Sequence, residues 1–502
     1  MDGPGTQRHC PGLGAMKPSD DTFRNIHFVT LGCPKNRVDS ELMLGHLHEA
    51  GLEFSTTPED ADVVVVNTCG FIEDAKKESI EVILEMARHR AEGRVRKLIV
   101  TGCLVQRYAK DLADEIPEVD AFLGNGAYEA VAQLAGTAPK ASAEPPTIDV
   151  ESPRFLHQAT TPRINTFLPH SAYVKVSEGC DQKCAFCIIP KLRGKQRSRP
   201  VADIVREAEG LAARGVVELN LVAQDLTGYG YDQKQKPSLA DLLVALDRVD
   251  GLQWIRVHYL YPRPFSKALL RALGESEKVV PYVDMPLQHI ADRVLKRMNR
   301  GRPRRFVERL LEDIRGAIPD VTLRTSFIVG FPGETDRDFE ELCDFVSDQD
   351  FARVGVFKFS REEDTPSFEM ENQVEPEVVD ARYHHLMQLL RQKSRDHLAE
   401  FEGRRVNVLV DGVSSETELL LEGRHAGQAP EVDGTIYLAE GQELAQAGDI
   451  VEVEITETHD YDLVGRIERV LHRAPERPSH PRMDALSLAP LTAGRRRLRV
   501  VT

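Results

Sequence analysis

Two long blocks of the sequence alternate β-branched or apolar runs of strand length with longer stretches of helical spacing. Buried strands joined by helices are typical of parallel sheets, whose strands are covered on both faces. The larger block, 165–403, predicts an incomplete (βα)6 barrel, with its chemistry at the carboxyl ends of the strands. Its six strand candidates are AYVKVS, VVELNLVAQD, WIRVHYLYP, VVPYVDMPLQH, VTLRTSFIVG and ARVGVFKFS.

The blocks on either side have different patterns. Block 24–135 contains the runs HFVTLGC, DVVVVNTCG and KLIVTGC, each followed by a helical stretch, and predicts a smaller α/β domain with a parallel sheet. Block 404–472 has five short strand runs and no helical period, which predicts an all-β, OB-like barrel. We expect a disordered leader at 1–23, a low-complexity linker at 136–164 and a disordered basic tail at 473–502.

The bulk composition limits the class of protein. A chain of 502 residues is expected to contain more than one domain, and no apolar run approaches the length of a membrane span. The N-terminus lacks the apolar core of a secretory signal, so we expect a cytoplasmic protein, with Met1 and Met16 both open as the start. The eight cysteines therefore favour metal binding or catalysis over disulfides.

Three of these cysteines occupy equivalent places in the first α/β block. Cys33, Cys69 and Cys103, the N-terminal triplet, each end a predicted strand just before a helix, and a glycine stands beside each one. The carboxyl ends of parallel strands meet at one edge of a sheet, so the three thiols can converge on one iron–sulfur cluster. The alternative is three small buried residues that pack at strand ends.

Three more cysteines lie close together in the chain. Cys180, Cys184 and Cys187, the loop triplet, have the spacing C-x3-C-x2-C, which can wrap three thiolates around one cluster and leave its fourth iron open. A zinc site is the alternative, but structural zinc requires four ligands and no fourth Cys or His follows at the usual spacing. Cys343 has the surroundings of a core residue, and Cys10 lies in the leader.

A three-cysteine loop at the end of the first barrel strand resembles the radical S-adenosylmethionine (SAM) superfamily. Together with the N-terminal triplet and a C-terminal barrel of TRAM type, residues 25–472 resemble the methylthiotransferase family. Within that family, five strings are similar to the branch that modifies a ribosomal protein: LGCPKNRVDSE (31–41), AQDLTGYGYD (223–232), HYLYP (258–262), DMPLQH (284–289) and RTSFIVGFPGET (324–335).

The resemblance implies a complete reaction. Each triplet would bind one 4Fe–4S cluster, and SAM would serve both as radical source and as methyl donor. The target would be the β-carbon of one aspartate in small-subunit ribosomal protein S-twelve, whose C–H bond is too weakly acidic for a side-chain base. A radical formed at the loop triplet would remove the hydrogen, and the cluster of the N-terminal triplet would provide sulfur. An electron donor and a sulfur donor would be further partners.

Polar residues near the ends of the predicted barrel strands are candidates for holding these ligands. A basic stretch also follows the loop triplet; it either pairs with carboxylates or is solvated, and it contains Arg193, Lys195, Arg197 and Arg199. We predict cofactor contacts from Gln224, Asp225, Arg324, Ser326 and Gly330, and a substrate contact from His289.

The charge of the last block bears on the substrate. Residues 404–471 contain five arginines and no lysine against fifteen acids, a net charge of −10. RNA phosphates need the opposite sign, so we expect no direct tRNA binding and favour a basic ribosomal protein, docked by acids such as Glu416, Glu418 and Glu431. The alternatives are a tRNA methylthiotransferase, a non-catalytic iron–sulfur electron carrier, and an acidic surface that serves only solubility.

Overall fold

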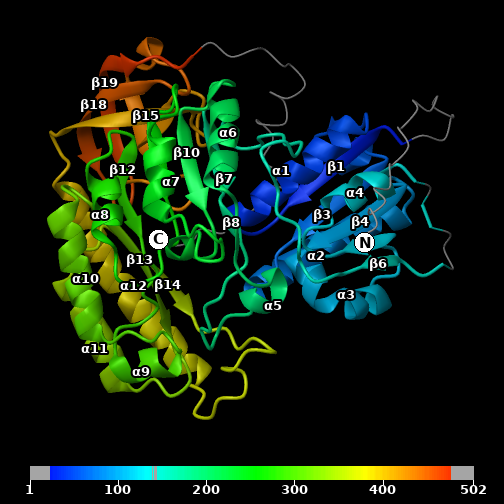
Figure 1. The fold of residues 1–502 in the computed structure, drawn as a ribbon, viewed down its shortest axis with the longest axis horizontal. Helices are drawn as coiled ribbons and strands as arrows, with labels where there is room; N and C mark the ends of the chain where they lie inside the picture. Colours follow the sequence, from blue (N-terminus) through cyan, green and yellow to red (C-terminus); the bar gives the residue numbers. More distant parts are fainter. Residues whose placement is uncertain (1–22, 138, 141–143, 476–502) are drawn as a thin grey trace, which may run out of the picture.

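The computed structural model describes residues 23–137, 139–140 and 144–475, which form three successive regions, each with its own sheet (Figure 1). Most of the predicted leader, including Cys10 and Met16, and most of the predicted tail lie outside the described residues. Among the described helices, none has both the length and the apolar character needed to cross a lipid bilayer.

The first region is a six-stranded parallel sheet in the order β2-β1-β3-β4-β5-β6. Its central strands, β3 and β4, are buried along their whole length, which explains their continuous apolar sequences. The strands are β1 (Asn25–Thr30), β2 (Glu53–Ser55), β3 (Val63–Thr68), β4 (Lys97–Gly102), β5 (Ala121–Leu123) and β6 (Thr147–Asp149), and the helices are α1 (Pro34–Glu49), η1 (Pro58–Asp60), α2 (Glu73–Ala91), α3 (Cys103–Glu115) and α4 (Tyr128–Ala135).

The prediction of a linker over 136–164 is wrong at β6, which pairs in parallel with β5 at the edge of the first sheet. Thr147 N donates to the Asp120 carbonyl at 3.0 Å. A three-residue edge strand is too short to carry a hydrophobic period, and it forms because the edge of β5 has backbone groups that need partners.

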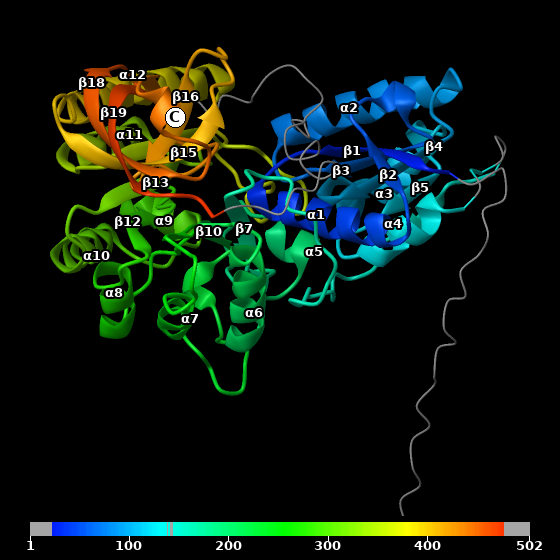
Figure 2. The same ribbon diagram turned by 90° about the horizontal axis from the view of Figure 1, so that it is seen from above.

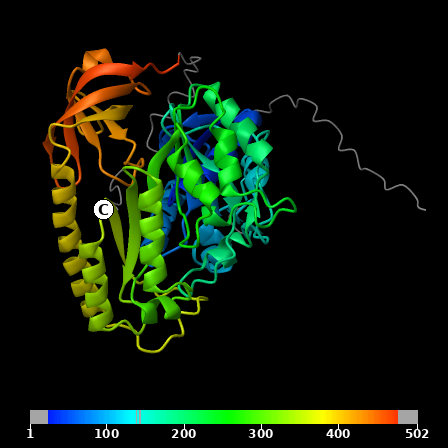
Figure 3. The same cartoon turned by 60° about the vertical axis from the view of Figure 1, so that its left-hand side comes forward.

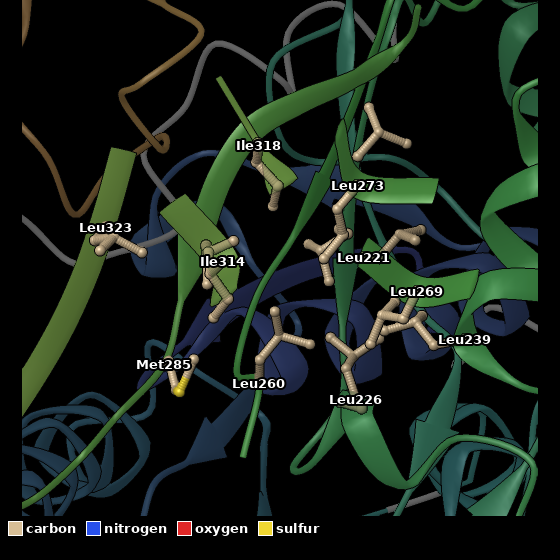
Figure 4. Packing of buried hydrophobic residues seen from close by; sticks show 14 of the residues in the cluster. Leu221, Leu226, Leu239, Leu260, Leu269, Leu273, Met285, Ile314, Ile318 and Leu323 are labelled. Atoms are coloured by element: carbon tan, nitrogen blue, oxygen red, sulfur yellow. The ribbon is translucent and has the colours of Figure 1, made fainter. Parts of the chain in front are cut away.

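The second region is the predicted incomplete barrel, an open parallel sheet in the order β14-β13-β12-β11-β10-β7. Its largest apolar core includes Leu221 of β10, Leu323 of β13 and Ile314 of α10 (Figure 4). The strands are β7 (Ser171–Lys175), β10 (Glu218–Val222), β11 (Trp254–Val257), β12 (Val279–Asp284), β13 (Thr322–Val329) and β14 (Arg353–Lys358), and the helices are α6 (Val201–Ala212), η2 (Leu226–Gly228), α7 (Leu239–Leu246), α8 (Lys267–Gly274), α9 (Asp292–Arg297), α10 (Arg304–Ala317) and α11 (Asp336–Asp348).

The chain between β7 and α6 carries the loop triplet and faces the first region. A short ribbon of β8 (Ser177–Glu178) and β9 (Arg197–Ser198) closes its base, and α5 (Ile189–Arg193) follows Cys187. Figure 2 shows α1 and α5 on the side of each region that faces the other, and α1 contacts β7. The two predicted cluster sites therefore lie on facing sides of these regions.

The third region is a closed five-stranded barrel, reached through the long helix α12 (Pro376–Ala399) (Figure 3). Buried ion pairs fix it to the second region: the Arg424 guanidinium of the barrel lies 2.8 Å from Glu218 of β10, and within the barrel it lies 2.7 Å from Asp411. His170 Nε2 lies 3.1 Å from the same Asp411 carboxylate. The strands are β15 (Arg405–Val413), β16 (Leu421–His425), β17 (Ile436–Glu440), β18 (Ile450–Thr458) and β19 (Leu463–His472), with η3 (Gln442–Leu444) between β17 and β18.

Candidate functional site

The N-terminal triplet gathers where three neighbouring strands of the first sheet end. Cys33 precedes α1, Cys69 follows β3 and Cys103 begins α3. A Cβ atom built on Gly32, whose φ is +91°, would lie 2.8 Å from the Cys69 Cβ, so only glycine fits beside that cysteine. The fold thus brings together three thiols that are far apart in the sequence.

The surroundings of these thiols disfavour the charged thiolate form. Burial raises the pKa of Cys69, and the neighbouring Cys103 and Cys33 raise it further. Burial also raises the pKa of Cys103, although the Arg193 guanidinium opposes the shift. Three thiolates this close repel one another, and the iron of a cluster is a positive charge that would relieve the repulsion.

Arg193 is a cation in direct contact with this triplet, and it comes from the second region. Its Nη2 donates to Cys103 Sγ at 3.3 Å, while its Nη1 donates to Asp39 at 2.6 Å and lies 3.3 Å from Glu178. Lys175 is ion-paired with the same two carboxylates. A buried charge network therefore crosses the boundary between the two regions.

The other basic residues after the loop triplet have different surroundings. Arg199 is buried and pairs with Asp203 at 2.7 Å and with Glu207 at 2.5 Å. Arg197 donates to the backbone carbonyls of Arg193 and Lys195. The interpretation as carboxylate partners thus holds for Arg193 and Arg199, whereas Lys195 is exposed.

The loop triplet has contacts within its own loop and with one arginine from farther along the chain. Burial raises the pKa of Cys180 to about 11 and that of Cys187 to about 12, and the Cys184 thiol contributes to both shifts. Arg300 Nη1 donates to Cys184 Sγ at 3.5 Å. The backbone N–H of Cys180 donates to the Gly194 carbonyl at 3.1 Å, which fixes the start of the loop.

Neither triplet has the spacing of ligands around a single ion. Among the described residues, no three His, Cys, Asp or Glu side chains form a group that could hold one metal ion. A cubane cluster has a different requirement, because each thiolate binds a different iron and the sulfur atoms stand farther apart.

Two predicted cofactor contacts lie beside the loop triplet, directly after β10. Gln224 Nε2 donates to Glu178 at 2.9 Å, and its buried Oε1 has no hydrogen-bond partner within the described part of the chain. Asp225 accepts from Gln182 Nε2 at 2.9 Å and pairs with Arg263 at 2.5 Å. The orphaned amide oxygen fits a ligand that donates hydrogen bonds, as SAM does through its amino group.

The remaining predicted contacts have partners within the protein. Arg324 is the third residue of β13 and pairs with Asp284, the last residue of β12, at 2.9 Å and with Asp433 at 3.4 Å, so its cofactor contact stays a prediction. A strand-length pattern does not tell which end of the strand a polar residue faces. Ser326 is buried in the middle of the same strand.

Gly330 and His289 both lie beside the buried side chain of Glu334. Gly330 follows β13 with a φ of +79°, and its N–H donates to Glu334 at 3.0 Å. His289 is fully buried, its Nδ1 accepts from the Ala291 N–H at 3.1 Å, and its Nε2 lies 3.5 Å from Glu334. The substrate contact of His289 stays a prediction.

Lys35, Glu178 and Arg300 are the residues near the triplets that sequence reasoning missed. Burial alone would lower the pKa of Lys35, but Tyr259, Cys33 and Asp284 act against it and the pKa is raised. Lys35 and Glu178 each lie two residues from a triplet cysteine, and this closeness in the sequence could have identified them as site residues. Arg300 had no such signal, because it lies more than a hundred residues after Cys184.

Comparison with known proteins identifies all three regions. Residues 25–124 match the uncharacterized protein family UPF0004, residues 174–346 match the radical SAM superfamily, and residues 403–467 match the TRAM domain. The chain is 53% identical to the ribosomal protein uS12 methylthiotransferase RimO of Anaeromyxobacter sp. strain K, over 93% of this chain and 98% of that relative. The chain belongs to the RimO family.

Other relatives agree with this assignment. The RimO protein of Myxococcus xanthus is 48% identical, over 92% of this chain and 95% of its own length. Among solved structures, the radical SAM methyltransferase TsrM of Kitasatospora setae is 15% identical and superposes with a TM-score of 0.50 over 68% of this chain and 77% of its own, a likeness of fold alone.

The resemblance to the methylthiotransferase family, and to its branch that modifies a ribosomal protein, is confirmed. As a RimO-family protein the chain is a radical SAM methylthiotransferase, which excludes the electron-carrier alternative. Membership also implies SAM and iron–sulfur chemistry.

Proposed function

We propose that this enzyme replaces a hydrogen on the β-carbon of one aspartate of ribosomal protein uS12 with a methylthio group. SAM serves as both radical source and methyl donor, and each cysteine triplet holds one 4Fe–4S cluster. The observation that carries the proposal is a buried network across the boundary, in which Arg193 donates to Cys103 and lies 3.3 Å from Glu178, which accepts from Gln224. The N-terminal triplet is thus linked to residues that flank the loop triplet, one of which has an unsatisfied amide oxygen.

The residues around the loop triplet hold SAM and orient the cysteine loop. When bound, a cluster with one iron free of protein ligands supplies the electron that splits SAM into a carbon radical, and a second such cluster supplies sulfur. Gln224 offers its unpaired Oε1 to the amino group of SAM. Asp225 positions the loop through Gln182, and Arg300 donates to Cys184 and so offsets thiolate charge.

The reaction sets requirements on partners. Each turnover consumes an electron and a sulfur atom that this chain does not itself generate, so an electron donor and a sulfur donor must both act on it. Cys103 is buried, whereas Cys33 and Cys69 are partly exposed, so the sulfur-donating site is accessible on one side.

The charge of the third region favours uS12 over tRNA. A net charge of −10 over 404–471 repels phosphates and attracts a basic protein. Glu431 belongs to a different group from Glu416 and Glu418, because it pairs with Arg37 of the first region at 2.6 Å. We assign docking to Glu416 and Glu418, which lie between β15 and β16, and exclude Glu431.

Mass spectrometry of purified uS12 and of bulk tRNA, from cells with and without this gene, tests the substrate. We expect one aspartate-containing uS12 peptide to gain a methylthio group only when the gene is present, with tRNA nucleosides unchanged. A methylthio nucleoside that depends on the gene, with uS12 unmodified, would overturn the proposal. Iron and sulfide analysis after anaerobic reconstitution tests the cofactors, and an amount matching one cluster per chain would contradict two.

A further inference from the structure

Lys35 reaches from the first region to the second. It lies in the first turn of α1, two residues after Cys33, and its Nζ is 3.4 Å from the centre of the Tyr259 ring. Tyr259 lies just beyond the carboxyl end of β11, the edge at which the second sheet has its chemistry. The lysine ammonium therefore lies over the reactive edge of the second sheet.

Three of the strings that resemble the ribosomal-protein branch meet at this point. Lys35 belongs to 31–41, Tyr259 to 258–262, and Asp284 to 284–289. The Tyr259 N–H donates to Asp284 Oδ2 at 3.1 Å, and Tyr259 has a φ of +58°, a conformation that a bulky residue rarely adopts. Strained residues of this kind are found preferentially at binding and catalytic sites.

The Lys35 charge is available to a ligand. Lys175 pairs with Asp39 and Glu178, whereas Lys35 has no carboxylate oxygen within 4.0 Å in the described ranges of the chain. An aromatic ring stabilises an ammonium group through its face, yet it does not use all three N–H donors. Lys35 is also only half-buried as a residue.

Contacts on either side place Lys35 between the two triplets. Cys33 is two residues away on the same chain segment. On the other side, the Tyr259 carbonyl accepts from the Leu226 N–H at 3.1 Å, and the preceding residue, Asp225, accepts from Gln182 of the cysteine loop. A group bound at Lys35 is therefore held by the segment that carries Cys33 and is connected through Tyr259 to residues that hold the cysteine loop.

We propose that the Lys35 ammonium binds the side-chain carboxylate of the target aspartate, with Tyr259 and Asp284 holding the lysine in place. The inference rests on the proposed function and deepens it. In aspartate the carboxylate carbon is bonded directly to the β-carbon, so fixing the carboxylate also fixes the carbon that reacts. A charge-assisted hydrogen bond of this type selects aspartate over the isosteric asparagine.

Peptide binding to the reconstituted holoenzyme tests the inference. Fluorescence anisotropy would compare labelled peptides that span the uS12 target and carry Asp or Asn at its position. We expect the wild type to bind the Asp peptide about tenfold more tightly, as expected for a hydrogen bond to a charged group. Lys35→Met should remove this preference, and Lys35→Arg should restore part of it.

Lys77→Met is the matched control, because Lys77 is a lysine of the first region with a 65% exposed side chain that pairs with Glu73 on its own helix. It should keep the full preference for Asp. Iron content and melting temperature of each variant show whether it is folded and loaded.

The outcomes separate the two proposals. If the wild type modifies uS12 but binds the Asp and Asn peptides equally well, the role of Lys35 is overturned and the proposed function still holds. This outcome does not depend on whether the variants fold. A loaded Lys35→Met variant that keeps the wild-type preference has the same meaning. A wild type that does not modify the Asp peptide or uS12 overturns the proposed function and this inference together.

Discussion

The two cysteine triplets are built in opposite ways. The loop triplet lies within eight consecutive residues, Cys180 to Cys187, and its start is fixed by a backbone bond to nearby Gly194. The N-terminal triplet comes from three strand ends, and its thiols meet only when the register of the first sheet is correct. A ligand set carried by one loop tolerates errors elsewhere in the fold, whereas one gathered from a sheet depends on the whole sheet.

The cations beside the two triplets extend this contrast. Arg300, beside the loop triplet, belongs to the same region as the cysteines. Arg193, beside the N-terminal triplet, belongs to the neighbouring region, so that site needs two regions to be packed together. The N-terminal site is therefore the more sensitive to changes at the boundary between regions.

The largest effect is expected from Cys184→Ala. Removing one of three thiolates from the loop triplet should abolish formation of 5′-deoxyadenosine, because the cluster that reduces SAM would be lost. Chromatography of the reaction mixture measures this product. The iron content should fall to that of one cluster, and 5′-deoxyadenosine at the wild-type rate would contradict the assignment.

Cys69→Ala should separate the two sites. We expect 5′-deoxyadenosine to form at close to the normal rate while methylthiolated uS12 disappears, because only the sulfur-donating site is damaged. Mass spectrometry of uS12 and chromatography of the same sample measure both. If Cys69→Ala and Cys184→Ala both still yield methylthiolated protein, the roles are assigned wrongly.

Arg193→Gln tests whether the boundary supports the N-terminal site. Leaving Asp39 and Glu178 buried without one of their cations should destabilise the protein by roughly 3–5 kcal/mol. Urea denaturation measures this change. The control is Arg206→Gln, which removes an arginine with a 64% exposed side chain and should cost at most about 1 kcal/mol.

Equal losses of unfolding free energy in the two arginine variants would show that the boundary network contributes no more to stability than an exposed ion pair does. Iron retention sharpens the test: Arg193→Gln should lose iron from the N-terminal site first. Preferential loss from the loop site would reverse the comparison.

The smallest effect is expected from charge reversal on the barrel. Glu416→Lys with Glu418→Lys should weaken binding of uS12 several-fold at low salt and have little effect at high salt, because salt already screens the attraction. The control is Glu85→Lys, an exposed acid on α2 of the first region. Salt titrations of uS12 binding measure the difference, and equal behaviour of both variants would exclude docking at the barrel.

Much of the fold could be predicted because strand burial leaves a clear pattern. The central strands β3 and β4 are buried on both faces, and their apolar runs predicted them directly. The edge strand β6 has no such pattern, because only its pairing with β5 defines it. The same holds for Arg324, whose partners Asp284 and Asp433 come from distant parts of the chain.

The site divides in the same way. The spacing of the loop triplet predicted a local arrangement, and the strand-end positions of the N-terminal triplet predicted its convergence. Arg193 was singled out only as one of four basic residues, since the sequence does not contain the packing that places it against Cys103. The interactions between regions are the features of the site that could be found only from the structure.

The buried attachment of the barrel has a consequence for how a partner is captured. Because Arg424 links Glu218 to Asp411, the barrel does not swing as a tethered module would. A protein held by its acidic surface is thereby presented to the second sheet at a fixed offset, and its reactive side chain experiences a high effective concentration there. On the proposed docking, selectivity includes distance: the aspartate at the matching offset would be modified, and an aspartate elsewhere on the same surface would be out of reach.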